Sequence, residues 1–329
     1  MDIIEVHRKD IDTFEVGKII FSNKKHLIVQ EYSPYGEYDG YILNEKSQIK
    51  RIVTKSNYLN YIQSILSSNN DTIKFTSKED MISYAIDNDK LLYVVLNSWM
   101  FFKILKPIQL KDNISYCYVL DNYGKILNEK HISIDKILFI EIDSIMLRKL
   151  EYYLKHKNQP NNKQLELVEI YIDKSNAFNV GEIIISNKDF LLAKSYDTCG
   201  IYNGYLYQNK NIITKISSRT NYLKFMKNII SIDETNYNFI DEYSIIDYAF
   251  KNKRFISIAY SKCKYCYDVK INDFDGKTIK YQIITQTGKL DKEKSLDIKK
   301  INYVLIDSIE LKILEKLLAT KEVSKYPFV

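Results

Sequence analysis

The sequence contains few of the residues that cross-link or punctuate small folds. It has nine glycines, four prolines and four cysteines in 329 residues. Four cysteines in a chain this long do not make the disulfide framework of a small secreted domain. Histidine is equally scarce, with four residues, which leaves little material for a histidine-based active site or metal centre.

Long apolar runs are also missing. The first ten residues, MDIIEVHRKD, carry charges where a secretory signal needs an apolar stretch. No window approaches the roughly 18 uninterrupted apolar residues that indicate a membrane-spanning helix. We therefore expect a cytoplasmic protein that does not enter a membrane.

The composition is that of a folded chain with a weak basic excess. Hydrophobic residues make up 45% and charged residues 27%, and the net charge is +6, close to the usual globular balance. Lysine, isoleucine, asparagine and tyrosine are residues of A/T-rich codons, and the basic residues are interleaved with 42 acidic ones. We therefore interpret the charge as a mixed solvated surface, and nucleic-acid binding stays an alternative.

The scarce glycines reveal an internal duplication. Eight of the nine pair at an offset of 164 residues, and two copies of that length account for 328 of the 329 residues. We predict a first module at 1–155, a linker at 156–164 and a second module at 165–329. The glycine pairs are Gly17 with Gly181, Gly36 with Gly200, Gly40 with Gly204, and Gly124 with Gly288.

A weaker repeat lies within each module. Counting from four of these glycines, a Ser or Thr recurs twenty residues on and is followed by apolar residues spaced three, three and four apart. Ser and Thr are preferred N-caps, and that spacing is typical of one helical face. We predict further helices at 78–89 and 242–253. The four predicted caps are Ser56, Ser144, Thr220 and Ser308.

Short β-branched and aromatic stretches separated by turn residues precede each predicted cap, which indicates strands. Closure of a few short strands into a barrel would remove exposed sheet edges. The predicted fold class is α+β, mostly β. Each 164-residue module is expected to contain two small barrels, each closed by a C-terminal helix. The four predicted barrels are at 14–66, 90–155, 178–230 and 254–320.

Strands on either side of Tyr38-Asp39-Gly40-Tyr41, followed by a helix starting at Ser56-Asn57-Tyr58-Leu59, resemble the Sm-like and SH3-like small-barrel proteins of bacteria. The twin segment 178–230 shows the same resemblance. It implies a barrel fold that serves many functions. The basic-Gly pair of Sm-like RNA binders is missing from the sequence, so their RNA pocket is not carried over.

Catalytic motifs are not evident. A catalytic group that both modules need should appear in both, but none of the four histidines has a histidine at the matching position. Cys263-x-x-Cys266 has Trp99 and Phe102 as counterparts, so we interpret it as part of a turn rather than half of a zinc site. We expect no catalytic residues, no metal and no cofactor.

The repeated Tyr-x-Gly-Tyr element is the best candidate binding site. Aromatic rings with a nearby cation can stack bases or anchor a partner protein. The alternative is that the glycine forms a β-bulge and the tyrosines pack on neighbouring strands. The candidate binding residues are Tyr38, Tyr41 and Lys55 in the first module and Tyr202, Tyr205 and Arg219 in the second.

Duplication without catalytic residues favours a non-enzymatic interaction protein whose two copies form an intramolecular pseudo-dimer. A bacterial or phage accessory, immunity or defence factor acting on a partner protein would fit this pattern. The first alternative is a nucleic-acid-binding protein, and the second is a small-ligand sensor or enzyme with a site between the modules.

Overall fold

The computed structural model describes residues 3–9, 14–34, 36–66, 73–96, 102–156, 165–172, 177–230, 237–260, 266–284 and 290–319. The chain divides into two compact units, Met1–Asn158 and Gln159–Val329. Apart from His156, the predicted linker lies outside the described residues. Each unit is described by itself below.

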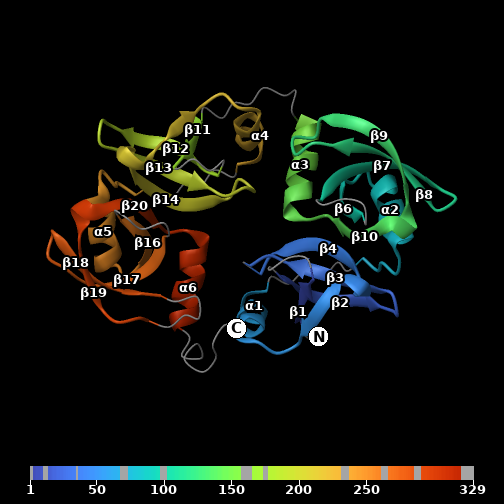
Figure 1. Ribbon diagram of the computed structural model, residues 1–329, viewed down its shortest axis with the longest axis horizontal. Coiled ribbons are helices and arrows are strands. Elements are labelled where there is room, and N and C mark those ends of the chain that lie inside the picture. The colour runs from blue at the N-terminus through green and yellow to red at the C-terminus, as the bar shows by residue number, and fades with distance from the viewer. Residues whose placement is uncertain are drawn as a thin grey trace. The chain divides into compact units, whose positions relative to one another are not determined.

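The first unit is mostly β and ends in a helix (Figure 1). Its strands are β1 (Ile3–Arg8), β2 (Phe14–Ser22), β3 (His26–Tyr32), β4 (Tyr38–Glu45), β5 (Ile49–Val53), β6 (Leu92–Leu96), β7 (Lys103–Lys111), β8 (Ile114–Leu120), β9 (Ile126–Ser133) and β10 (Ile137–Ile142). Its α-helices are α1 (Asn57–Ile65), α2 (Lys78–Asp87) and α3 (Ile145–His156).

The second unit repeats this order (Figure 1). Its strands are β11 (Leu167–Tyr171), β12 (Phe178–Ser186), β13 (Phe190–Tyr196), β14 (Tyr202–Asn209), β15 (Lys215–Ser217), β16 (Phe255–Tyr260), β17 (Tyr267–Phe274), β18 (Thr278–Ile283), β19 (Lys294–Asp297) and β20 (Ile301–Ile306). Its α-helices are α4 (Asn221–Ile229), α5 (Glu242–Lys251) and α6 (Ile309–Ala319).

The strands of each unit form one ten-stranded antiparallel sheet, and this corrects the predicted barrels. The order is β5-β1-β2-β3-β4-β10-β6-β7-β8-β9 in the first unit and β15-β11-β12-β13-β14-β20-β16-β17-β18-β19 in the second. The prediction of two closed barrels per module, at 14–66 and 90–155 and again at 178–230 and 254–320, was therefore wrong.

The physical reason is the partner that β4 takes. To close the first predicted barrel, β4 would have to pair with β5, but it pairs with β10, with Tyr41 opposite Ile142 and Asn44 opposite Phe139. Strand β4 is buried on both faces. A sequence pattern can indicate such burial, but it does not show which neighbouring strand pairs with β4. As a result β5 is left at the outer edge of the sheet.

The sheet nevertheless coils strongly. Four inter-strand steps separate β1 from β10, which in a flat sheet would be about 19 Å. In the structure the guanidinium carbon of Arg8 on β1 lies 4.6 Å from the ring centre of Phe139 on β10. The inner face of the coiled half thus encloses a small core of its own, with Val6 and Val29 among its buried residues.

The opposite face of the central strands carries the larger core of the first unit. Helix α2 covers this face next to β7 and β10 (Figure 1). Met81, Ile82 and Ala85 of α2 are buried against residues of the central strands such as Leu43 and Val94. The predicted helices at 78–89 and 242–253 are confirmed as α2 and α5.

The four predicted N-caps are confirmed. The hydroxyls of Ser56 and Thr220 accept hydrogen bonds from the amides of Leu59 and Leu223, at 3.0 and 3.1 Å. The hydroxyls of Ser144 and Ser308 accept hydrogen bonds from the amides three residues on, at 3.4 and 3.2 Å. Each bond satisfies an amide in the first turn that has no partner within its helix.

Candidate functional site

The tyrosines of the Tyr-x-Gly-Tyr element lie at the start of β4 and of β14. The side chains of Tyr41 and Tyr205 are each 1% exposed. Their hydroxyls accept hydrogen bonds from the backbone amides of Ile73 and Tyr237, at 2.8 and 3.0 Å. These two rings are therefore built into the core and offer no open face to a partner.

Glycine is required between the tyrosines for two reasons. Gly40 and Gly204 have φ of +88° and +89°, in the region that side chains with a Cβ rarely adopt. A Cβ on Gly40 would also lie 2.2 Å from the carbonyl oxygen of Ile142, and one on Gly204 would lie 2.0 Å from that of Ile306. The glycine therefore allows β4 to pack closely against the end of β10.

The residue before each glycine caps a distant helix. The Oδ1 atom of Asp39 accepts a hydrogen bond of 2.6 Å from the amide of Ile145, and Oδ1 of Asn203 accepts one of 3.0 Å from the amide of Ile309. These are the first amides of α3 and α6. Each cap ties the Tyr-x-Gly-Tyr element to the last helix of its unit.

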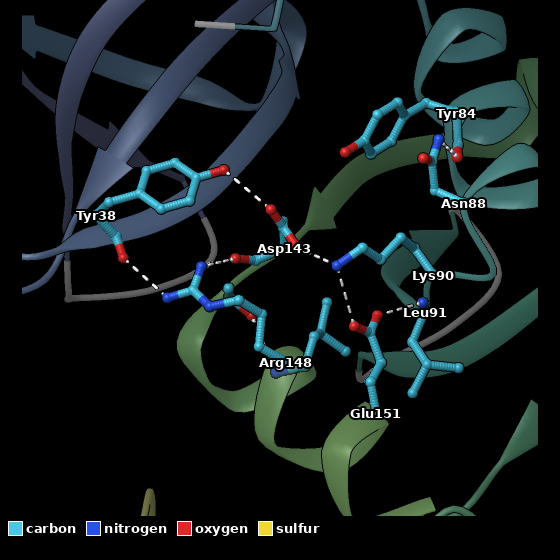
Figure 2. A network of polar contacts seen from close by, with 10 residues as sticks. Tyr38, Tyr84, Asn88, Lys90, Leu91, Asp143, Arg148 and Glu151 are labelled. Carbon is cyan, nitrogen blue, oxygen red and sulfur yellow. Dashed lines mark hydrogen bonds and ion pairs between the residues drawn. The ribbon is translucent and has the colours of Figure 1, made fainter. Parts of the chain in front are cut away.

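Tyr38 belongs to a charged network that Figure 2 shows at close range. Its hydroxyl donates to Oδ2 of Asp143 at 3.3 Å. Lys90 lies between two carboxylates, with Nζ 2.8 Å from Oδ1 of Asp143 and 3.3 Å from Oε2 of Glu151. Arg148 completes the network, with its guanidinium carbon 5.1 Å from the centre of the Tyr38 ring. Burial lowers the pKa of Lys90, but its hydrogen bonds to the two carboxylates outweigh this and raise it.

The second unit builds the same network with its two cations exchanged. Arg254, at the position of Lys90, contacts Asp307 at 2.7 Å and Glu315 at 2.9 Å. Lys312, at the position of Arg148, lies 3.1 Å from Asp307 and 5.6 Å from the ring centre of Tyr202. Charge and position are retained while lysine and arginine change places. We interpret the network as a structural link between β4, β10 and the last helix.

The two predicted cations lie elsewhere in the fold. Lys55 follows β5 and Arg219 follows β15, and both side chains are exposed. No contact between either cation and the tyrosines is seen among the described residues. Within each unit, the structure thus brings the predicted tyrosines together, with ring centres 5.7 Å and 6.1 Å apart. It leaves the cations on a separate segment.

A second repeated cluster, which sequence reasoning missed, lies on the outer face of β1. Glu5 accepts hydrogen bonds from the N-cap hydroxyl of Ser56 and from Nε2 of His7, the latter at 3.0 Å. In the second unit Glu169 accepts from Thr220 and from the hydroxyl of Tyr171, the latter at 2.8 Å. The signal was present in the sequence, because Glu5 and Glu169 match at the 164-residue offset.

The chemistry of this cluster is not that of a hydrolytic triad. In a triad the histidine stands between the nucleophile and the carboxylate, so that it can take the nucleophile's proton. Here Glu5 stands between Ser56 and His7, and the position of His7 is a tyrosine in the second unit. Ser56 also serves as a helix cap. The arrangement orders the end of β1 and the start of α1.

Exposed apolar residues recur at equivalent positions on the strands at this end of each sheet. Phe14 and Phe178 are 38% and 36% exposed, and Ile52 and Ile216 are both 42% exposed. Exposed apolar residues are common one at a time. The same pair exposed at the same place in both copies is less easily explained by chance.

The segments that contain these isoleucines also account for the excess of positive over negative charge in the chain. Residues 46–66 contain four Lys or Arg and 210–230 contain five, with no Asp or Glu in either. The other residues hold 39 cations (48 − 9) and all 42 acidic side chains. We call segments 46–66 and 210–230 the basic edges, because each contains the outermost strand β5 or β15.

The remaining sequence features show little chemistry. Among the described residues, no group of three or more His, Cys, Asp or Glu is placed to hold a metal ion. Cys266 is exposed and free, and Cys263 lies outside the described residues. Within the described part of the chain, no helix is both long and apolar enough to span a membrane.

Comparison with known proteins gives no relative from which a function could be carried over. No protein-family model matches the chain, and no curated protein matches it either. The candidate site is therefore defined by the structure and the internal repeat, which single out the two basic edges with their exposed apolar residues.

Proposed function

We propose that this protein is a non-enzymatic binding protein that holds an anionic partner protein through the basic edge of each unit. The observation that supports this most strongly is the distribution of charge. The nine cations of the two basic edges exceed the net charge of +6, so the positive charge of the protein is concentrated in two equivalent surfaces. Opposite charge across an interface speeds association and selects partners.

The second half of each unit contains a segment that corresponds to the basic edge by the weaker internal repeat, and the charges of this segment nearly balance. Residues 134–154 carry three cations and four acidic side chains, and residues 298–318 carry four cations and three. A bias toward lysine codons would enrich all four segments. Because only two are free of acidic residues, the codon explanation of the basic excess does not account for the basic edges.

The proposal is tested with the full-length protein and a fluorescent acidic polypeptide, poly-L-glutamate, by anisotropy at low and moderate salt. We expect binding that weakens as salt rises, because screening acts on exposed charges. Reversal of two charges on each edge, Lys50→Glu with Lys55→Glu and Lys215→Glu with Arg219→Glu, should weaken binding by about tenfold or more.

A matched control also reverses four exposed cations, but outside the basic edges: Lys125→Glu with Lys130→Glu in the first unit and Lys299→Glu with Lys300→Glu in the second. This variant should bind the polypeptide nearly as well as the unaltered protein does. The proposal fails if poly-L-glutamate does not bind at low salt, or if the control variant loses as much affinity as the edge variants.

Nucleic-acid binding is the second candidate, because basic segments next to aromatic residues also suit single strands. A fluorescent oligothymidylate is the probe that separates the two. If it binds the basic edges more tightly than the acidic polypeptide does, the partner is a nucleic acid and the proposal of a partner protein is wrong.

A further inference from the structure

Strands β5 and β15 stand at the end of the strand order of their sheets. Among the described residues, β5 pairs only with β1, with Val6 opposite Ile52 and His7 opposite Arg51. In the same way β15 pairs only with β11. On the outer side of such a strand, alternate N–H and C=O groups are available to another strand.

We propose that the partner's acidic segment adds as an extended β-strand to the outer edge of β5 and of β15. This inference rests on the proposed function, and it specifies how the partner binds. Strand addition draws affinity from main-chain hydrogen bonds and specificity from alternate side chains. Both contributions can be read from the residues of the two edges.

The side chains of the edge strands define what the added strand should carry. Directly paired residues share a face of the sheet, so Ile52 extends the inner row that contains the buried Val6. Ile216 extends the equivalent row beside the buried Ile170. An aliphatic side chain on an added strand would cover each isoleucine and continue the row.

The opposite face of each edge strand presents a cation. Arg51 lies opposite His7, and Lys215 lies opposite Tyr171, with its Nζ 5.0 Å from the centre of that ring. An acidic residue directly opposite on an added strand would have its Cβ about 5 Å from the Cβ of the cationic residue, close enough for the two charged groups to pair. The added strand should therefore alternate acidic and aliphatic residues.

The charge of the edges also excludes one competing occupant. Two basic edges would bring like charges directly opposite each other if they paired, which destabilises a sheet. Positive charge is a common device by which edge strands avoid pairing with copies of themselves. The same charge favours an acidic strand over a second copy of this protein.

The aromatic rings beside the edges suit a peptide better than a nucleic acid. The Phe14 ring packs against His7 at 4.9 Å and edge-on against Tyr58 at 5.3 Å. In the second unit Lys215 already contacts the Tyr171 ring. These contacts occupy part of each ring and so reduce the face on which bases could stack.

The other ends of the two sheets do not repeat such a surface. Strand β9 has eight residues, with Ile126 and Leu127 more than half exposed, whereas β19 has four residues. Strand β9 also carries both Glu129 and Lys130. Among the described residues, the β5 and β15 ends alone combine a terminal strand, a cation and an exposed isoleucine in both units.

The test uses the full-length protein and a soluble peptide of alternating Glu and Val as the probe. Two further peptides carry N-methyl groups on one or the other set of alternate backbone amides. An added strand donates hydrogen bonds from one of its two edges only. One methylated peptide should therefore lose about tenfold or more in affinity while the other keeps most of it.

Hydrogen exchange locates the binding site. The parent peptide should slow exchange of alternate amides within 49–53 and 215–217. Two peptides should bind per chain, and the variant Arg51→Glu with Ile52→Asp should reduce this to one. Because both altered side chains are exposed, the fold should persist, and the remaining site at β15 is the internal check that it does.

The outcomes distinguish this inference from the proposed function. If both methylated peptides bind as well as the parent, charge alone holds the partner, so strand addition is wrong and the proposed function stands. If exchange slows only outside the edge strands, strand addition is again wrong. If neither the alternating peptide nor poly-L-glutamate binds at low salt, both proposals fail.

Discussion

On the inner face of the coiled sheet, the first unit has Arg8 and Glu15 where the second unit has Ile172 and Asn179. Arg8 is 3% exposed, and its Nη1 atom lies 3.8 Å from Oε1 of Glu15. Its guanidinium also lies over the ring of Phe139. In the second unit Ile172 packs beside buried apolar residues at the same place.

The contrast extends to two more carboxylates. Glu31 and Glu141 of the first unit are replaced by Ser195 and Leu305 in the second. Burial raises the pKa of Glu31 well above its usual range, and the nearby Glu141 raises it further. Burial likewise raises the pKa of Glu141 to about 7. The same backbone therefore accepts either four ionisable side chains or four uncharged ones at these interior positions.

This difference shows which features the fold itself requires. Both units keep the glycine of the Tyr-x-Gly-Tyr element, the positions of the helix caps and the Asp-centred network, although the lysine and arginine of the network change places. The interiors have diverged, whereas the basic edges keep three cations and one exposed isoleucine at matching positions. These are Lys46, Arg51, Ile52 and Lys55 in the first unit and Lys210, Lys215, Ile216 and Arg219 in the second. This retention supports our proposal that the edges bind a partner.

The largest expected effect is at Arg8. Replacing Arg8 with Ala leaves the largely buried carboxylate of Glu15 without this cation and removes the guanidinium packed on Phe139. The loss should lower the stability of the first unit by about 3–5 kcal/mol. Calorimetry of the full chain measures this as a lower melting temperature for one of two transitions. A fourfold variant gives the first unit the residues of the second at these positions: Arg8→Ile, Glu15→Asn, Glu31→Ser and Glu141→Leu. It should recover most of the stability lost in Arg8→Ala. If the fourfold variant is no more stable than Arg8→Ala, the interior residues of the second unit cannot replace those of the first.

The second-largest loss of stability should be equal in the two units, because the backbone at Gly40 and Gly204 has the same conformation. Gly40→Ala and Gly204→Ala should each cost about 2–4 kcal/mol, since a strained φ is combined with a clash. Gly276→Ala is the control, because it also has a positive φ of +87° but its Cβ would have no contact shorter than 3.7 Å. It should cost only about 1 kcal/mol. Equal losses for all three in chemical denaturation would contradict the close approach of β4 and β10.

The smallest effect concerns pH and should be confined to the first unit. Because the folded-state pKa of Glu141 is about 7, above its usual 4.5, the native state binds more protons than the unfolded state between these values. The stability of the first unit should therefore fall as pH rises from about 4.5 to 7. Glu141→Leu should stabilise it by about 1–2 kcal/mol at pH 8 and much less at pH 4.5. The melting temperature measured across this range is the check, and a pH-independent gain would contradict the assignment.

Several features could be predicted because they depend on local sequence. The N-caps at Ser56 and Thr220 and the helices they begin follow from side-chain hydrogen bonding and helical periodicity. The partner of β4 could not be predicted, because its two buried faces are compatible with pairing to β5 or to β10. The error of closed barrels came from this one pairing.

The binding site predicted from the sequence overlaps the basic edges at two residues. Lys55 and Arg219 lie within the basic edges, just after β5 and β15, whereas Tyr41 and Tyr205 of the same predicted site are part of the packing of β4 and β14. Proximity in sequence suggested that they act together. The charge of the edges could have been found by counting charges in each segment rather than over the whole chain.

The amino-acid sequence by itself determined the duplication, the short strands, the capped helices and the total charge, because each depends on residue identity and local spacing. Tertiary structure decided which strands became central and which became edges, because strand pairing is a long-range choice among similar apolar surfaces. By pairing β4 with β10 and leaving β5 outermost, the fold placed the basic segment of each unit on an exposed sheet edge.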